Sequence, residues 1–173
     1  MTDLKNKNLI KKIFSRMPLI LLFTSILNNF DFNYLDLKYF SFNFSYIIIF
    51  YYSLKKSESL GYIYIFIAGL FNDVMIGTPI GLSSLMYLIL CGAAAYLRNI
   101  TLRPNLIKDG IFFLTTMLII NSLLYIALNF IFSHELNYFD QIINTLFTFL
   151  LYFLFSSIFD FFENNFVGKN NAR

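Results

Sequence analysis

Residues 68–88 of the chain read AGLFNDVMIGTPIGLSSLMYL, and they place one carboxylate, that of Asp73, inside a largely apolar run. Three glycines (Gly69, Gly77 and Gly81) and a proline (Pro79) stand close to it in the sequence. A charge is costly in apolar surroundings unless it is paired or hydrogen-bonded. The fold prediction therefore depends on the composition of the rest of the chain and on the groups that pair with the Asp73 carboxylate.

The composition of the whole chain predicts an integral membrane protein. Of its 173 residues, 58% are hydrophobic and only 13% are charged. Soluble domains average about half apolar and about a quarter charged residues. A chain of this size would expose much of that apolar surface to water, whereas a bilayer solvates it. The small net charge of +3 gives no basic surface that would indicate nucleic-acid binding.

Six apolar segments are candidates for membrane-spanning helices, which need about 20 residues each. They cover residues 13–27, 40–54, 61–74, 79–97, 110–132 and 141–162. The prediction is therefore an all-α bundle of six transmembrane helices, with residues 1–173 as a single polytopic domain. Tails and loops are too short to hold a soluble module.

The distribution of lysine and arginine predicts the orientation of this bundle. An even number of spans puts both ends of the chain on one side of the membrane. Of 13 Lys and Arg residues, only Lys38 falls on the side opposite to the ends. Since positive charge accumulates on the cytoplasmic side, both termini are expected to be cytoplasmic. The twelve lysines and arginines on the same side as the chain ends are Lys5, Lys7, Lys11, Lys12, Arg16, Lys55, Lys56, Arg98, Arg103, Lys108, Lys169 and Arg173.

Small residues are concentrated in the third and fourth spans. Gly61, Gly69, Gly77 and Gly81 are spaced in multiples of four, in register with Asp73. Such a stripe lets helix backbones approach closely in lipid. The pattern predicts that these two spans form the tightly packed centre of the bundle, and that the Phe-rich sixth span is more exposed to lipid. The predicted helix-packing positions are Gly61, Gly77, Gly92 and Ala93.

The residues after Asp73 predict a tight turn between the third and fourth spans. Pro79 disfavours helical geometry at Thr78 but suits the first turn of a new helix. We therefore expect Gly77 to end the third span, Thr78 to cap the fourth and Pro79 to begin it. Two interpretations of Asp73 follow: its carboxylate faces the free N–H groups that start the fourth helix, or it is a proton or cation site.

The chain lacks the residues of the common catalytic centres. Its one histidine, His134, falls in a loop, and its one cysteine, Cys91, lies in an apolar span where a packing role is expected. One histidine and one cysteine do not make a zinc site, and no phosphate-binding glycine loop is present. We therefore predict a non-catalytic protein without metal or cofactor. Asn121, Ser122, Asn144, Thr145 and Thr148 are expected to form hydrogen bonds between helices.

The segment 61–99, GYIYIFIAGLFNDVMIGTPIGLSSLMYLILCGAAAYLRN, resembles the core of the rod shape-determining protein MreD family. The resemblance lies in Gly69 four residues before Asp73, in the turn with Pro79 and Gly81, and in a small-residue helix that ends in Arg98. It implies that Gly69, Asp73, Pro79 and Gly81 form the partner-binding or structural turn of that family. The six spans and the basic N-terminus agree with it.

The resemblance implies a scaffold of the cell-elongation machinery in the bacterial inner membrane. Its expected partners are a single-span protein like MreC and, through it, MreB, RodA and a penicillin-binding transpeptidase, as well as membrane lipid. Two alternatives remain open. One is a substrate-binding subunit of an energy-coupling-factor vitamin transporter, although residues 16–30 lack the spaced alanines with which such subunits dock. The other is a small proton-coupled transporter centred on Asp73.

Overall fold

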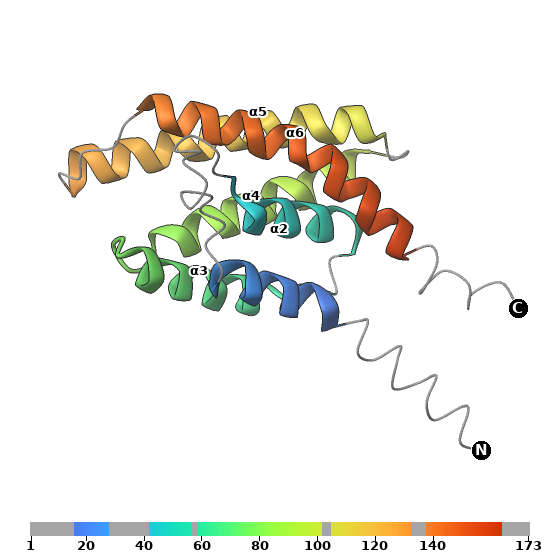
Figure 1. Cartoon of the computed structure of the whole chain (residues 1–173), viewed down its shortest axis with the longest axis horizontal. Helices are drawn as coiled ribbons and strands as arrows, with labels where there is room; N and C mark the ends of the chain where they lie inside the picture. Colours follow the sequence, from blue (N-terminus) through green and yellow to red (C-terminus); the bar gives the residue numbers. More distant parts are fainter. Residues whose placement is uncertain (1–15, 28–41, 57–58, 102–104, 133–137, 164–173) are drawn as a thin grey trace, which may run out of the picture.

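The computed structural model describes residues 16–27, 42–56, 59–101, 105–132 and 138–163 (Figure 1). Within these ranges all regular secondary structure is helical and no strand occurs, which confirms the all-α prediction. Several residues used above fall outside these ranges, among them Lys38, Arg103, His134 and the chain ends. The proposed limits of the first span at residue 13 and of the second at residue 40 also lie outside them.

The described residues form six α-helices that follow one another in the sequence. The first is Arg16–Leu27, followed by α2 (Phe44–Lys55), α3 (Tyr62–Ile76), α4 (Leu82–Ile100), α5 (Leu106–Ile126) and α6 (Tyr138–Phe162). A short π-helical turn, η2 (Ala127–Ile131), extends α5. Two of these helical segments, Leu106–Ile131 and Tyr138–Phe162, are long and apolar enough to cross a membrane.

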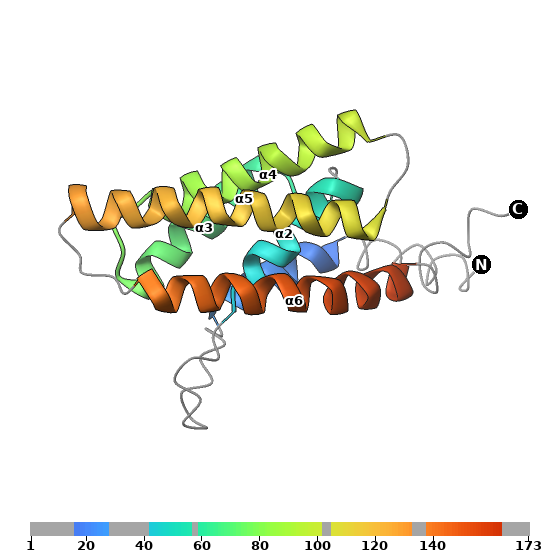
Figure 2. The same cartoon turned by 90° about the horizontal axis from the view of Figure 1, so that it is seen from above.

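The helices form three layers (Figure 1). α5 and α6 make one outer layer, α2 and α4 the middle layer, and α3 with the helix Arg16–Leu27 the other outer layer. Seen from above, α5 and α6 run antiparallel across the bundle (Figure 2). The starts of Arg16–Leu27 and α5 and the ends of α2, α4 and α6 meet at one end, which we call the basic end. Its described cations are Arg16, Lys55, Lys56, Arg98 and Lys108.

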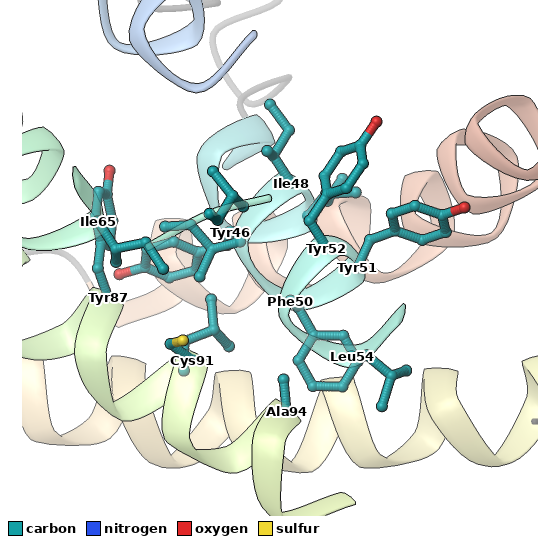
Figure 3. Packing of buried hydrophobic residues seen from close by; sticks show 14 of the residues in the cluster. Tyr46, Ile48, Phe50, Tyr51, Tyr52, Leu54, Ile65, Tyr87, Cys91 and Ala94 are labelled. Carbon is teal, nitrogen blue, oxygen red and sulfur yellow. The ribbon is translucent and has the colours of Figure 1, made fainter. Parts of the chain in front are cut away.

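The most completely buried helix is α2, which shares the middle layer with α4. The prediction from the small residues is therefore right that α3 and α4 pack closely and that α4 is central, but wrong for α3, which lies in an outer layer. All ten residues from Ser45 to Leu54 are buried, whereas only four residues of α3 are. Figure 3 shows α2 side chains projecting toward α4, with Tyr46 beside Tyr87 and Phe50 near Ala94. The polar groups of α2 are satisfied inside the core, since Ser53 donates to Cys91 Sγ at 3.2 Å and Ser45 bonds Ser25 at 2.9 Å. These bonds allow a helix with several polar side chains to be fully enclosed.

The outer layers expose apolar side chains along their whole length. α5 and α6 do so on the faces turned away from α2 and α4, as expected for the sixth span, and α3 does the same on the opposite side. Examples are Ile63, Phe71 and Val74 on α3, Ile111, Ile119 and Ile126 on α5, and Leu146, Leu150 and Leu154 on α6. Exposed apolar surface of this extent is unusual for a monomer in water.

Two ion pairs join the last residues of α2 to the end of α6. Lys55 Nζ lies 2.7 Å from Asp160 Oδ2, and Lys56 Nζ lies 2.9 Å from Glu163 Oε1. Tyr51 also donates its hydroxyl to Asp160, at 2.7 Å. The helix ends are thereby held together at the basic end of the bundle.

Exchanging the charges of Lys55 and Asp160 should reveal a measurable coupling energy between the two side chains. The side chains of Lys55 and Asp160 are 25% and 34% exposed, so solvent weakens the pair and we expect a coupling energy of about 1 kcal/mol. Lys55→Asp and Asp160→Lys should each lower the thermal stability of the purified protein, and the double variant should recover part of the loss. A double variant whose loss equals the sum of the single losses would mean that the pair does not contribute.

Candidate functional site

The turn between α3 and α4 begins with a glycine in a left-handed conformation. Gly77 follows the last residue of α3 with φ of 78°, a conformation that residues with a side chain rarely adopt. Its N–H and that of Thr78 both donate to the carbonyl oxygen of Asp73, at 2.9 and 3.1 Å. This arrangement closes the C-terminus of α3, at the glycine where the sequence predicts it to end.

The side chain of Asp73 is fully buried and accepts three hydrogen bonds. Thr78 Oγ1 donates to Oδ1 at 2.9 Å and the N–H of Ser83 donates to the same oxygen at 2.9 Å. The N–H of Gly81 donates to Oδ2 at 2.7 Å. Bonds from two backbone N–H groups and a hydroxyl are those that an ionised carboxylate accepts best.

Asp73 therefore caps the N-terminus of α4, although it belongs to a different helix, α3. The first N–H groups of a helix have no partner inside it, and an Asp, Asn, Ser or Thr at the N-cap usually accepts from one of them. The N-cap of α4 is Gly81, which has no side chain. The carboxylate arrives instead from α3, where its charge also interacts favourably with the dipole of α4. The cap thus ties two helices together.

The prediction that Thr78 caps α4 and that Pro79 begins it is wrong. α4 begins at Leu82, three residues later. Residues 79–82 form a turn in which the N–H of Leu82 donates to the carbonyl of Pro79 at 3.2 Å. Gly81 occupies its third position with φ of 98°, as a type II turn requires. Pro79 is the first residue of that turn, and Thr78 donates its hydroxyl to Asp73 instead of capping α4.

At Gly69, α3 and α4 approach each other closely. A Cβ added there would lie 2.3 Å from Ser84 Cα, well inside van der Waals contact. Beside this contact Ser84 Oγ donates to the carbonyl of Phe66 at 2.9 Å, and Asn72 Nδ2 donates to Ser83 Oγ at 3.0 Å. The absent side chain of Gly69 lets polar groups of both helices reach each other.

At the three glycines predicted as helix-packing positions, Gly61, Gly77 and Gly92, no neighbouring helix lies against the place of a side chain. An added Cβ would meet only Tyr64 of the same helix at Gly61, and nothing within 4 Å at Gly77 or Gly92. Gly92 is exposed and Ala93 is half-buried on α4. The regular spacing of the glycines is therefore not a continuous packing stripe, because Gly61 and Gly77 lie at the two ends of α3 and Gly81 lies in the turn.

One packing glycine was not predicted. A Cβ at Gly110 on α5 would lie 2.5 Å from the ring of Phe153 on α6. Gly110 is the first residue of the predicted span 110–132, and nothing around it in the sequence indicates the contact with Phe153.

Asn121, Asn144, Thr145 and Thr148 make the predicted polar contacts, whereas Ser122 is exposed on α5. Asn121 Nδ2 donates to Thr145 Oγ1 at 2.6 Å, which links α5 to α6. Asn43, which precedes α2, donates through its amide side chain to Asn144 Oδ1 at 3.1 Å and through its N–H to Thr148 Oγ1 at 3.0 Å. These bonds satisfy polar groups in an otherwise apolar interface.

Comparison with protein-family models, with curated proteins and with solved structures gives no match. The site is therefore interpreted from its own geometry. A buried carboxylate whose oxygens already accept three hydrogen bonds is suited to holding two helices in a fixed relation. The described parts of the chain contain no group of three His, Cys, Asp or Glu side chains that could hold a metal ion.

Proposed function

We propose that the chain is a non-catalytic scaffold subunit embedded in the bacterial inner membrane, with six spans and both termini in the cytoplasm. The exposed apolar faces of α3, α5 and α6 support the membrane environment. The grouping of Arg16, Lys55, Lys56, Arg98 and Lys108 at one end supports the orientation. The short helix α2 is enclosed by the others and need not meet lipid along a full bilayer.

The observation that carries the scaffold role is the rigid hairpin of α3 and α4. Its two helices are fixed to each other by Asp73 at the turn and by Gly69 at the crossing. Its outer side nevertheless stays open and apolar, with Ile63 and Val74 on α3 and Ile80 at the tip, where Ile80 is 78% exposed. A preorganised apolar surface loses little entropy when a partner helix docks against it.

We further propose that this hairpin serves the role that the MreD resemblance implies. The partner would be a single-span protein like MreC, which would connect the hairpin to MreB, RodA and a penicillin-binding transpeptidase. Residues 61–99 carry the resemblance; of its four positions, Asp73, Pro79 and Gly81 build the turn, whereas Gly69 lies within α3 at the contact with Ser84 of α4 and not in the turn. The function so proposed is positioning of the enzymes that build the elongating cell wall.

The geometry favours a structural role for Asp73 over proton transport. A carboxylate on a transport path has to release its ligands in each cycle, whereas Asp73 is buried and bonded to the backbone N–H groups of Gly81 and Ser83. Releasing it would leave those N–H groups without partners inside the bundle. Flux in proteoliposomes that depends on Asp73 would reverse this assignment.

The direct test is affinity purification of the tagged protein from its native host in mild detergent. We expect a single-span protein like MreC to be enriched, and depletion of the chain to convert rod-shaped cells to round ones. Ile80→Lys should weaken the enrichment without unfolding the protein, since Ile80 is exposed, whereas Asp140→Asn, on the exposed start of α6, should not. Normal shape after depletion, with no enriched single-span partner, would refute the proposal.

A further inference from the structure

The two outer layers of the bundle differ in the length of their apolar helices. α3 has 15 residues, whereas α5 with η2 has 26 and α6 has 25. At about 1.5 Å per residue, α3 is about 22 Å long. The uncharged stretches 110–131 of α5 and η2 and 141–159 of α6 are about 33 and 28 Å long. All three helices run lengthwise along the bundle (Figure 1).

The two ends of α3 limit where the hydrocarbon of a bilayer can begin and end on this side. Irregular backbone that faces lipid does not occur inside the hydrocarbon region. The turn of residues 77–81 is irregular, and Gly77, which has no side chain, exposes its backbone there. Residues 59–61 precede the helix, and Tyr62 and Tyr64 are exposed at its start, as in the aromatic belt of membrane proteins. Only the length of α3 itself is therefore left to face hydrocarbon.

The length of α3 does not match the thickness of an ordinary bilayer. The hydrocarbon core is about 30 Å thick, so α5 and α6 fit it with little or moderate tilt, whereas α3 falls short by about 8 Å. The exposed side chains of α3 are apolar along its whole length, among them Phe66, Phe71 and Val74. A bilayer adapts to a short apolar face by becoming thinner beside it.

We propose that the bilayer is thinner beside α3 than beside α5 and α6, so that the α3 side of the protein selects phospholipids with shorter acyl chains. This inference rests on the membrane location given in the proposed function. It also supplies a driving force for the docking of a partner helix at α3. A partner that covers this face releases the thinned lipid and removes the free-energy cost of thinning.

The test uses tryptophan as a reporter of the neighbouring lipid, because the chain contains none of its own. Phe71→Trp places the reporter on α3 and Leu150→Trp places it on α6, at side chains with matched exposures of 54% and 55%. Each purified variant is reconstituted into vesicles of phosphatidylcholine of one chain length, from about 14 to about 22 carbons, mixed with brominated phosphatidylcholine of fixed chain length. The brominated lipid quenches tryptophan on contact, so the competition gives the relative binding constant of each chain length at each reporter.

We expect the binding constant at the α3 reporter to peak at a chain length roughly two to four carbons shorter than at the α6 reporter. Equal optima, or a longer optimum at α3, would overturn the inference and leave the membrane location intact. Quenching at α6 alone would also overturn it, because protein rather than lipid would then cover α3. Absence of quenching at both reporters would refute the membrane location itself, and this inference with it.

A second reporter keeps the inference testable if Phe71→Trp does not fold, since the ring of Phe71 contacts that of Phe23. Phe66→Trp, at a side chain that is 44% exposed on α3, then takes its place. Its matched position on α6 is Ile142→Trp, also at a side chain that is 44% exposed. The expected and the contradicting outcomes are the same as for the first pair.

Discussion

Replacing Asp73 with alanine is expected to lower the stability of the protein by about 3–5 kcal/mol. The change leaves the N–H groups of Gly81 and Ser83 and the hydroxyl of Thr78 without an acceptor. For a chain of this size the loss corresponds to a fall of roughly 6–20 °C in the apparent unfolding temperature. Circular dichroism or thermal gel filtration in detergent measures it.

Thr78→Ala is the matched control for this variant. It removes one donor to Asp73 but leaves two backbone N–H groups bonded, so we expect a loss of about 1 kcal/mol or less. Asp73→Asn should fall between the two, because the amide keeps one oxygen to accept with. An Asp73→Ala protein as stable as the wild type would show that the carboxylate does not cap α4.

Substitution of Gly69 by alanine is expected to cost about 3 kcal/mol, and by leucine more. The new Cβ would lie 2.3 Å from the backbone of Ser84, so α3 and α4 have to move apart. Their separation would also lengthen the bond from Ser84 Oγ to the carbonyl of Phe66. The apparent unfolding temperature of the purified variants measures the effect.

Gly92→Ala is the comparison variant, and its expected effect on stability is opposite to that of Gly69→Ala. A Cβ at Gly92 meets nothing within 4 Å, and alanine favours a helix by about 1 kcal/mol over glycine. We therefore expect Gly92→Ala to be as stable as the wild type or more stable. Equal losses for Gly69→Ala and Gly92→Ala would contradict the close approach at Gly69.

One of the two interpretations of Asp73 in the sequence, a carboxylate facing the first N–H groups of α4, agrees with the structure, but the start of α4 was predicted wrongly. The spacing of Gly69 and Asp73 placed both on one face of α3, and the glycine after Ile76 marked the helix end. The start of α4 was misplaced because proline commonly occupies the first helical position. α4 begins later than predicted because Gly81 adopts a left-handed conformation in the preceding turn, and because its cap, Asp73, comes from α3. Such a cap is a tertiary contact that local sequence rules do not contain.

The central position of α2 was missed for a similar reason. Its tyrosines and serines resemble those of a partly polar peripheral helix. They can be buried because residues far along the chain accept their hydrogen bonds, such as Asp160 from Tyr51 and Cys91 from Ser53. The glycines pose the same difficulty, since Gly69 and Gly92 look alike in the sequence and differ only in what faces them.

The most direct test of the account is the membrane topology of α5 and α6 in living cells. In a Cys91→Ser background, single cysteines replace Lys108 at the exposed start of α5 and Asp140 at the exposed start of α6. With six spans and cytoplasmic termini, a membrane-impermeant maleimide should label Asp140→Cys in intact cells, and Lys108→Cys only after permeabilisation. Labelling of both positions in intact cells would contradict it.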